Sequence, residues 1–197
     1  MVYRGYDRED GLWDIEAELT DIKPYTFELP AEGPYPAHEP IHQLNIRLTV
    51  DDRMVIQDLA TSLDAIPHAE CEQSPANMSA LIGFTLGAGW RKVIEQHLGR
   101  TRGCTHLREM LFNMATAAFQ TIPSGVWQRR EASGLPQPEL TQPPPYLGQC
   151  MTWAFDSPTV QRIYPMLYAG PAPSRASAAP EPPAATPGQA DSPAAQR

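Results

Sequence analysis

Two stretches in which apolar and polar residues strictly alternate constrain the fold more than any other feature of this chain. In residues 12–20 the pattern is that of a half-buried antiparallel strand with a carboxylate-rich outer face. The two faces are Trp13, Ile15, Ala17 and Leu19 on one side and Asp14, Glu16, Glu18 and Thr20 on the other. Asp10-Gly11 separates this stretch from residues 3–9, which predicts a type I′ hairpin. The carboxylate row is interpreted as a solvated face, since nothing supplies the convergent ligands that a hard cation needs.

The second alternating stretch, residues 43–50, predicts another hairpin. Its apolar residues are Leu44, Ile46, Leu48 and Val50, followed by a turn at Asp51-Asp52 and a return strand at 54–63. In an antiparallel hairpin, the residue before the first strand and the residues after the second lie at the same end of the sheet. His42 and Cys71 are therefore expected near one another.

Helices are expected after the strands. Residues 105–122 carry apolar residues at intervals of three and four, which predicts an amphipathic helix with Thr105 as its N-cap. Pro123 is expected to end it. Shorter helices are expected at 78–84 and 90–98. The predicted fold class is α+β, a small antiparallel sheet of hairpins packed against C-terminal helices on one face.

The length of 197 residues supports one domain with a tail. Residues 1–168 are predicted to form a single α+β domain. Residues 169–197 are rich in Ala and Pro and contain no aromatic residue and no aliphatic residue larger than alanine. Such a segment cannot bury enough apolar surface to offset the entropy of ordering it, so a disordered tail is predicted.

Charge and composition exclude some partners. The formal net charge of −8 argues against a nucleic-acid surface, which should be basic, and against an anionic membrane surface. No apolar run approaches the roughly 18 residues that a membrane span needs, and no apolar leader is recognised at the start. A cytoplasmic location is therefore expected. There, three cysteines indicate free thiols or metal ligands rather than a disulfide framework.

The candidate site centres on Cys104 and His106, at the start of the helix predicted for 105–122. A helix N-terminus favours an anion and lowers the pKa of a thiol, and a thiolate beside an imidazole suits a soft divalent metal. With the two residues at the sheet end, the predicted metal site is His42, Cys71, Cys104 and His106, with zinc or iron as the ion. The plainer interpretation of Cys104 and His106 alone is a core cysteine and a capping or surface histidine.

Two other functions remain open from the sequence. One is a metal-free enzyme that acts on an acyl or aromatic catabolite, with Cys104 or Cys71 as nucleophile and His106 or another histidine as base. In that enzyme His42 and His68 are the other candidate bases, and Asp64 is the residue that would orient the base. The other function is a non-catalytic accessory or binding domain with a protein partner. Cys150 could serve as a further ligand or a resolving thiol, and the favoured interpretation is a packed cysteine.

Several blocks of sequence resemble a bacterial family known only as a domain of unknown function. The blocks are Gly11-Leu-Trp-Asp-Ile-Glu-Ala-Glu-Leu-Thr-Asp21, Pro40-Ile-His42, Arg47-Leu-Thr-Val-Asp-Asp52 and Gly103-Cys-Thr-His-Leu-Arg-Glu109. The likeness runs from residue 4 to about residue 168. The resemblance implies that the protein accompanies the enzymes of aromatic or steroid catabolism. It does not imply a defined activity. Met151 departs from the family's pattern, because the resemblance leads us to expect His directly after Cys150.

The order of the parts also resembles iron–sulfur scaffold proteins of the NifU and SufU type. In that family one ligand precedes a strand hairpin, one follows it and one lies at the start of a late helix. The resemblance implies these roles for His42, Cys71 and Cys104, with His106 nearby. His42 stands where a scaffold has Cys, which puts cluster assembly in doubt more than metal binding.

Overall fold

The computed structural model describes residues 1–137, 140 and 142–170. The chain forms two compact units, Met1–Glu139 and Leu140–Arg197. The single domain over 1–168 stays a prediction, and residues 171–197 of the predicted tail lie outside the described residues.

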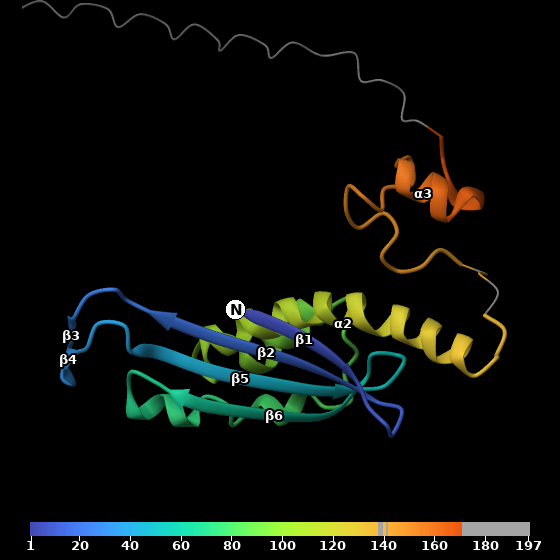
Figure 1. Ribbon diagram of the computed structural model, residues 1–197. Helices are drawn as coiled ribbons and strands as arrows, with labels where there is room; N and C mark the ends of the chain where they lie inside the picture. The colour runs from blue at the N-terminus through green and yellow to red at the C-terminus, as the bar shows by residue number, and fades with distance from the viewer. Residues whose placement is uncertain (138–139, 141, 171–197) are drawn as a thin grey trace, which may run out of the picture. The chain divides into compact units, whose positions relative to one another are not determined.

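The first unit is built on a four-stranded antiparallel sheet in the order β1-β2-β5-β6 (Figure 1). The strands are β1 Val2–Asp7, β2 Trp13–Ile22, β5 Pro40–Val50 and β6 Ile56–Ala65. A separate two-stranded sheet, β3 Phe27–Leu29 with β4 Gly33–Tyr35, lies between β2 and β5 in the chain. Both predicted hairpins are thus present, and the α+β class is confirmed.

The first hairpin turn differs from the predicted type I′. The Gly11 N–H donates to the Arg8 carbonyl at 3.1 Å, and Gly11, with φ 85°, is the only residue of the turn with a positive φ. A type I′ turn needs positive φ at both central residues, which are Glu9 and Asp10 here. The chain instead forms an ordinary turn that closes on a left-handed glycine, a position that favours Gly because it has no Cβ.

The inner face of the sheet carries the core that the alternation predicts. Pairing between β2 and β5 sets Ile15 opposite Leu48 and Leu19 opposite Leu44. The buried side chains of the two strands are Trp13, Ile15, Ala17, Leu19, Leu44, Ile46, Leu48 and Val50, each no more than 4% exposed. The inner rows are therefore continuous from the first hairpin turn to the far ends of β2 and β5.

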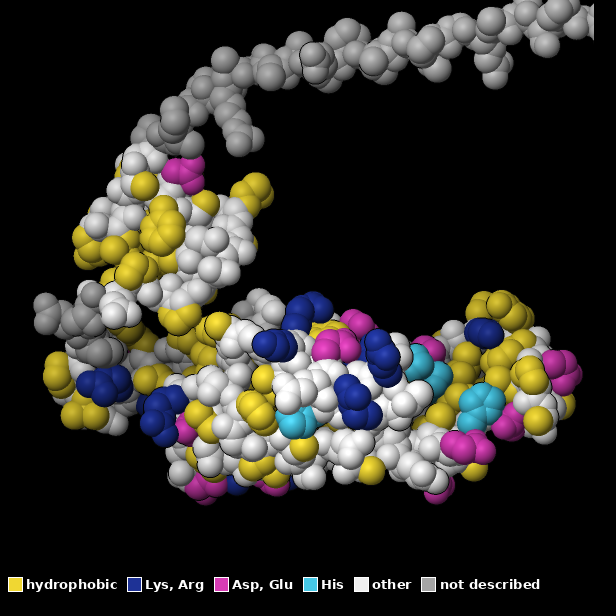
Figure 2. Space-filling model, turned by 180° about the vertical axis from the view of Figure 1, so that it is seen from behind, with side chains coloured by type: hydrophobic (Ala, Val, Ile, Leu, Met, Phe, Trp, Pro, Cys, Tyr) yellow, Lys and Arg dark blue, Asp and Glu magenta, His cyan; other side chains and the backbone are white. Residues whose placement is uncertain are grey.

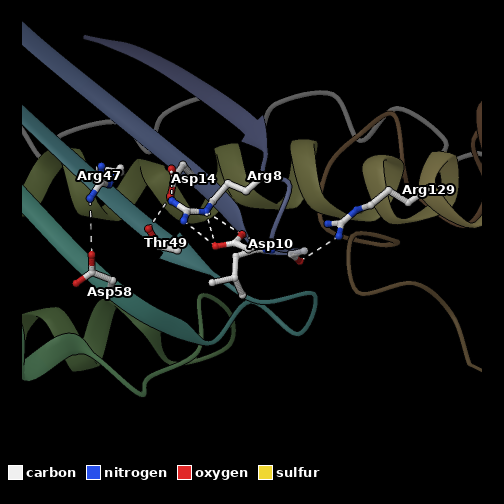
Figure 3. Close-up of polar contacts among 9 residues, drawn as sticks. Arg8, Asp10, Asp14, Arg47, Thr49, Asp58 and Arg129 are labelled. Carbon is white, nitrogen blue, oxygen red and sulfur yellow. Dashed lines mark hydrogen bonds and ion pairs between the residues drawn. The ribbon is translucent and has the colours of Figure 1, made fainter.

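The outer face is polar, and several of its charges are paired. Figure 3 shows Arg8 reaching Asp10 and Asp14, at 2.7 and 2.9 Å, while the Thr49 hydroxyl donates to Asp14. Arg47 lies 3.7 Å from Asp58 on the neighbouring strand. These pairs fit the interpretation of the carboxylate row as a solvated sheet face.

Helices cover the inner face of the sheet. The elements are η1 Ala69–Gln73, η2 Met78–Leu81, α1 Trp90–Leu98, η3 Arg100–Arg102 and α2 Thr105–Ala132, and α2 packs on β1 and β2 (Figure 1). The predicted N-cap of α2 was Thr105, whereas the residue at that position is Cys104. No helix among the described residues is long and apolar enough to cross a bilayer.

Helix α2 does not end at Pro123, so that prediction was wrong. A proline inside a helix costs about 3 kcal/mol, which packing beyond it must offset. Gly125 lets the helix approach Trp13, and the Arg129 guanidinium lies 3.9 Å from the Trp13 ring. Arg129 also donates to the Gly11 carbonyl at 3.0 Å and to the Asp52 carboxylate at 3.2 Å. These contacts hold the last turns of α2 on the sheet.

The helix and the central strand have matching lengths. From His106 to Arg129 α2 rises about 35 Å, and the 10 residues of β2 extend about 33 Å. Because Arg129 contacts Gly11, the start of α2 lies at the Asp21 end of the sheet.

The described part of the second unit contains α3 Pro158–Ile163 and η4 Pro165–Leu167. Trp153 lies between two tyrosines, with ring centroids 4.9 Å from Tyr146 and 6.3 Å from Tyr164. The hydroxyls of these tyrosines are 2.5 Å apart. Cys150 is exposed, so its interpretation as a packed cysteine was wrong.

Candidate metal centre

Asp21 and His42 form a cross-strand pair where the inner face of the sheet ends. They face each other in the β2–β5 register, one row beyond the buried pair of Leu19 and Leu44. The His42 backbone N–H donates to the Asp21 carboxylate at 2.7 Å, and the ring Nδ1 lies 3.1 and 3.2 Å from the two carboxylate oxygens. The His42 side chain is 14% exposed and that of Asp21 is 45% exposed. The pair is thus fixed at the backbone yet open to solvent on the carboxylate side.

His106 reaches this pair from the first turn of α2. Its ring centroid is 4.0 Å from that of His42, with the planes inclined at 42°. One ligand atom from each of Asp21, His42 and His106 lies within 4.8 Å of the other two. These three residues are called the ligand triad below.

The surroundings favour the neutral form of His106. Burial lowers the pKa of His106 below its ordinary value, and the nearby His42 lowers it further, while Asp21 acts in the opposite direction. A neutral imidazole keeps a lone pair, which a metal ion requires. Figure 2 shows histidine side chains at the surface at one end of the first unit, beside acidic and hydrophobic side chains.

Cys104 adjoins the triad without belonging to it. It is the residue before α2, half-buried against the core, and its Sγ lies 3.7 Å from His106 Nδ1. The structure therefore brings together three of the four predicted metal residues, His42, Cys104 and His106.

Cys71 does not join them. It lies in η1, and within the described residues it is not part of a group of converging ligand atoms. The last pair of the β5–β6 ladder joins Gln43 and Ala65, so Cys71 follows six residues later. Six residues can extend about 20 Å, and strand pairing alone cannot fix where they lead. The other suggested residues are engaged elsewhere: Asp64 accepts from Asn45 at 2.8 Å and His68 contacts Glu32 at 2.8 Å.

Asp21 is the residue that the sequence reasoning missed. The inner face of β2 runs through positions 13, 15, 17 and 19, and its next position is 21. The inner face of β5 runs through 50, 48, 46 and 44, and its next position is 42. Extending both alternations by one step would have predicted Asp21 opposite His42.

Two imidazoles and a carboxylate are a donor set with known preferences. The same types of ligand bind catalytic zinc with a fourth position left to water, and they bind non-haem iron(II) with several positions left open. A hard cation such as calcium needs six to eight oxygen ligands, which this group does not offer. The arrangement can therefore bind a transition metal and leave room for a further ligand.

A match to a known protein family spans all the site residues. Residues 1–120 match a family described as protein of unknown function, DUF2889, and this range includes the triad and Cys104. No curated protein and no solved structure matches the chain. The expected likeness to scaffolds of the NifU and SufU type is not supported, in keeping with the position of Cys71 outside the group. The chain belongs to the DUF2889 family of proteins of unknown function.

Proposed function

We propose that this protein binds one divalent transition metal through Asp21, His42 and His106. The observation that carries the proposal is the approach of one ligand atom from each residue to within 4.8 Å of the others. The three residues come from β2, β5 and α2, and the first and last are 85 positions apart in the chain. The three side chains thus converge from three different elements at one end of the core.

The ion that suits the site is zinc or iron(II), and the role that suits it is catalysis. A structural zinc site uses four protein ligands, whereas three ligands leave a position for water or substrate. A metal bound here would lower the pKa of that water or polarise a substrate oxygen. The residues of the chain hold and orient the ion, and the partly exposed Asp21 gives solvent and substrate a way in.

The test is the metal content of the purified full-length chain. The protein is expressed in rich medium, purified without chelator and analysed by plasma mass spectrometry beside His42→Ala and His106→Ala. His97→Ala is the matched control, because His97 is half-buried on α1 against the Phe84 ring and is not one of the converging ligand residues. Near-stoichiometric zinc or iron that is lost in the first two variants and kept in the control supports the proposal. Metal-free protein, even after incubation with each ion, defeats it.

A second candidate function is a metal-free enzyme with Cys104 as nucleophile and His106 as base. The contact of 3.7 Å between Sγ and Nδ1 favours it, and the lowered pKa of His106 keeps a nitrogen free to accept the thiol proton. Its substrate would be an acyl or aromatic catabolite. The test is the alkylation rate of Cys104 in chelator-treated protein: a rate well above that of Cys150, lost in His106→Ala, supports the nucleophile. A rate unaffected by that substitution defeats it.

The proposed cellular location rests on the state of the cysteines. All three cysteines are free of disulfides, which suits a reducing compartment such as the cytoplasm. Fractionation of the native host, with the protein detected by antibody, tests the location. Recovery with a membrane or an extracellular fraction would contradict it.

A further inference from the structure

We propose that Cys104 is a fourth ligand of the triad's metal, so that the resting site is four-coordinate and suits zinc better than iron(II). This inference rests on the proposed function and adds to it a closed coordination shell and a choice of ion. It starts from the contact between Cys104 Sγ and His106 Nδ1, which is 3.7 Å long.

That distance is the one expected for two ligands on one zinc ion. Zinc bonds of about 2.3 Å to sulfur and about 2.05 Å to nitrogen, at a tetrahedral angle, separate the two ligand atoms by about 3.6 Å. The Asp21 oxygens and His42 Nδ1 are 3.1 and 3.2 Å apart, close to the corresponding separation for oxygen and nitrogen. Two edges of a tetrahedron are therefore nearly formed, one on the sheet and one on the helix.

The sulfur completes the site when the start of α2 moves slightly toward the end of the sheet. The atoms within 4.8 Å of one another come from the triad alone, so Sγ lies farther from at least one of them. Such a movement shortens that separation and keeps the contact of 3.7 Å between Sγ and His106 Nδ1. Cys104 is half-buried and precedes the first turn of α2, so the metal's attraction for a thiolate opposes only modest repacking.

A sulfur ligand also decides which ion suits the site. Thiolate is a soft ligand that selects zinc over iron(II) in a mixed nitrogen and oxygen site. Catalysis at such a centre requires the sulfur to leave when substrate binds, so Cys104 controls access to the metal.

Cobalt(II) is the probe, because it replaces zinc and a cobalt–sulfur bond gives a charge-transfer absorption in the near ultraviolet. The full-length Cys71→Ser/Cys150→Ser protein leaves Cys104 as the one thiol, since the chain has three cysteines. Adding Cys104→Ser removes it without weakening the helix start, because Ser is a favoured N-cap. Competition with a chelator gives the cobalt affinity of each protein.

We expect the sulfur band in the single-thiol protein and its loss in the triple variant, with visible cobalt absorption retained in both. Loss of an outer-shell partner already weakens metal binding about tenfold or more, so loss of a ligand should weaken it at least as much. Cobalt bound without a sulfur band, or a band that survives Cys104→Ser, overturns this inference and leaves the triad standing. Absence of cobalt binding in both proteins defeats the proposed function, and this inference with it.

Discussion

The Asp21 carboxylate meets His42 twice, at the backbone N–H and at ring Nδ1, across the last regular pair of the β2–β5 ladder. The pairing shifts register between Asp21 and Ile22, so the regular sheet stops where this pair sits. The apolar rows of the inner face thus end in a polar pair, and the start of α2 covers it. The hydrogen bond from the His42 N–H and the negative charge that Asp21 places beside the His42 ring can be tested separately.

Asp21→Asn separates the structural contact from the charge. Asparagine keeps an oxygen that accepts the His42 N–H, so the metal-free protein should lose less than about 1 kcal/mol of unfolding free energy. Metal affinity should fall about tenfold to a hundredfold, because the negative ligand is gone. Calorimetric titration with zinc measures the affinity, and urea unfolding measures the stability. Asp64→Asn is the matched control, because Asp64 is exposed and bonded to Asn45; equal affinities in both variants would count against the triad.

Metal binding should stabilise the first unit. An ion that binds only the folded chain adds about 2.7 kcal/mol when its free concentration is a hundred times the dissociation constant. We expect zinc to raise the midpoint of thermal unfolding, and chelator to reverse the rise. His106→Ala should unfold at the same temperature with and without zinc, while His97→Ala should respond as the unchanged protein does. A zinc response that persists in His106→Ala would place the ion elsewhere.

The sequence predicted the parts of this fold that a repeating pattern specifies. Alternation in β2 and β5 defines both the buried face and its register, and the same rule extended by one step reaches Asp21. Cys71 could not be placed, because it follows the last paired residue and no pattern constrains the chain there. The end of α2 was misjudged at Pro123, because local propensity gives no information on the contacts of Gly125 and Arg129 with the sheet.

Gly125 is expected to be essential to the packing of α2 on the sheet. A Cβ at this position would lie 2.1 Å from the Trp13 ring, which cannot easily yield because Trp13 Nε1 donates to Asp52 at 2.8 Å and Arg129 covers the ring. Overpacking costs about 1–3 kcal/mol, and this should exceed the gain of about 1 kcal/mol in helix propensity.

We therefore expect Gly125→Ala to lower the unfolding free energy in urea. Gly87→Ala is the control, because a Cβ there has no neighbour within 4 Å. A Gly125→Ala protein as stable as the unchanged chain would show that α2 leaves the sheet before this residue.

Tyr146 is expected to ionise at a higher pH than an ordinary tyrosine and to make the second unit less stable in alkali. Burial is the main cause that raises the pKa of Tyr146, and the hydrogen bond with Tyr164 adds to it. Because the folded state holds this proton more tightly than the unfolded state, stability should be constant up to the ordinary tyrosine pKa of about 10 and fall above it. Absorbance titration of tyrosinate should show one fewer late-ionising group in Tyr146→Phe. Tyr164→Phe should shift the late step only in part, since burial remains; a complete return to ordinary titration would make the hydrogen bond the main cause.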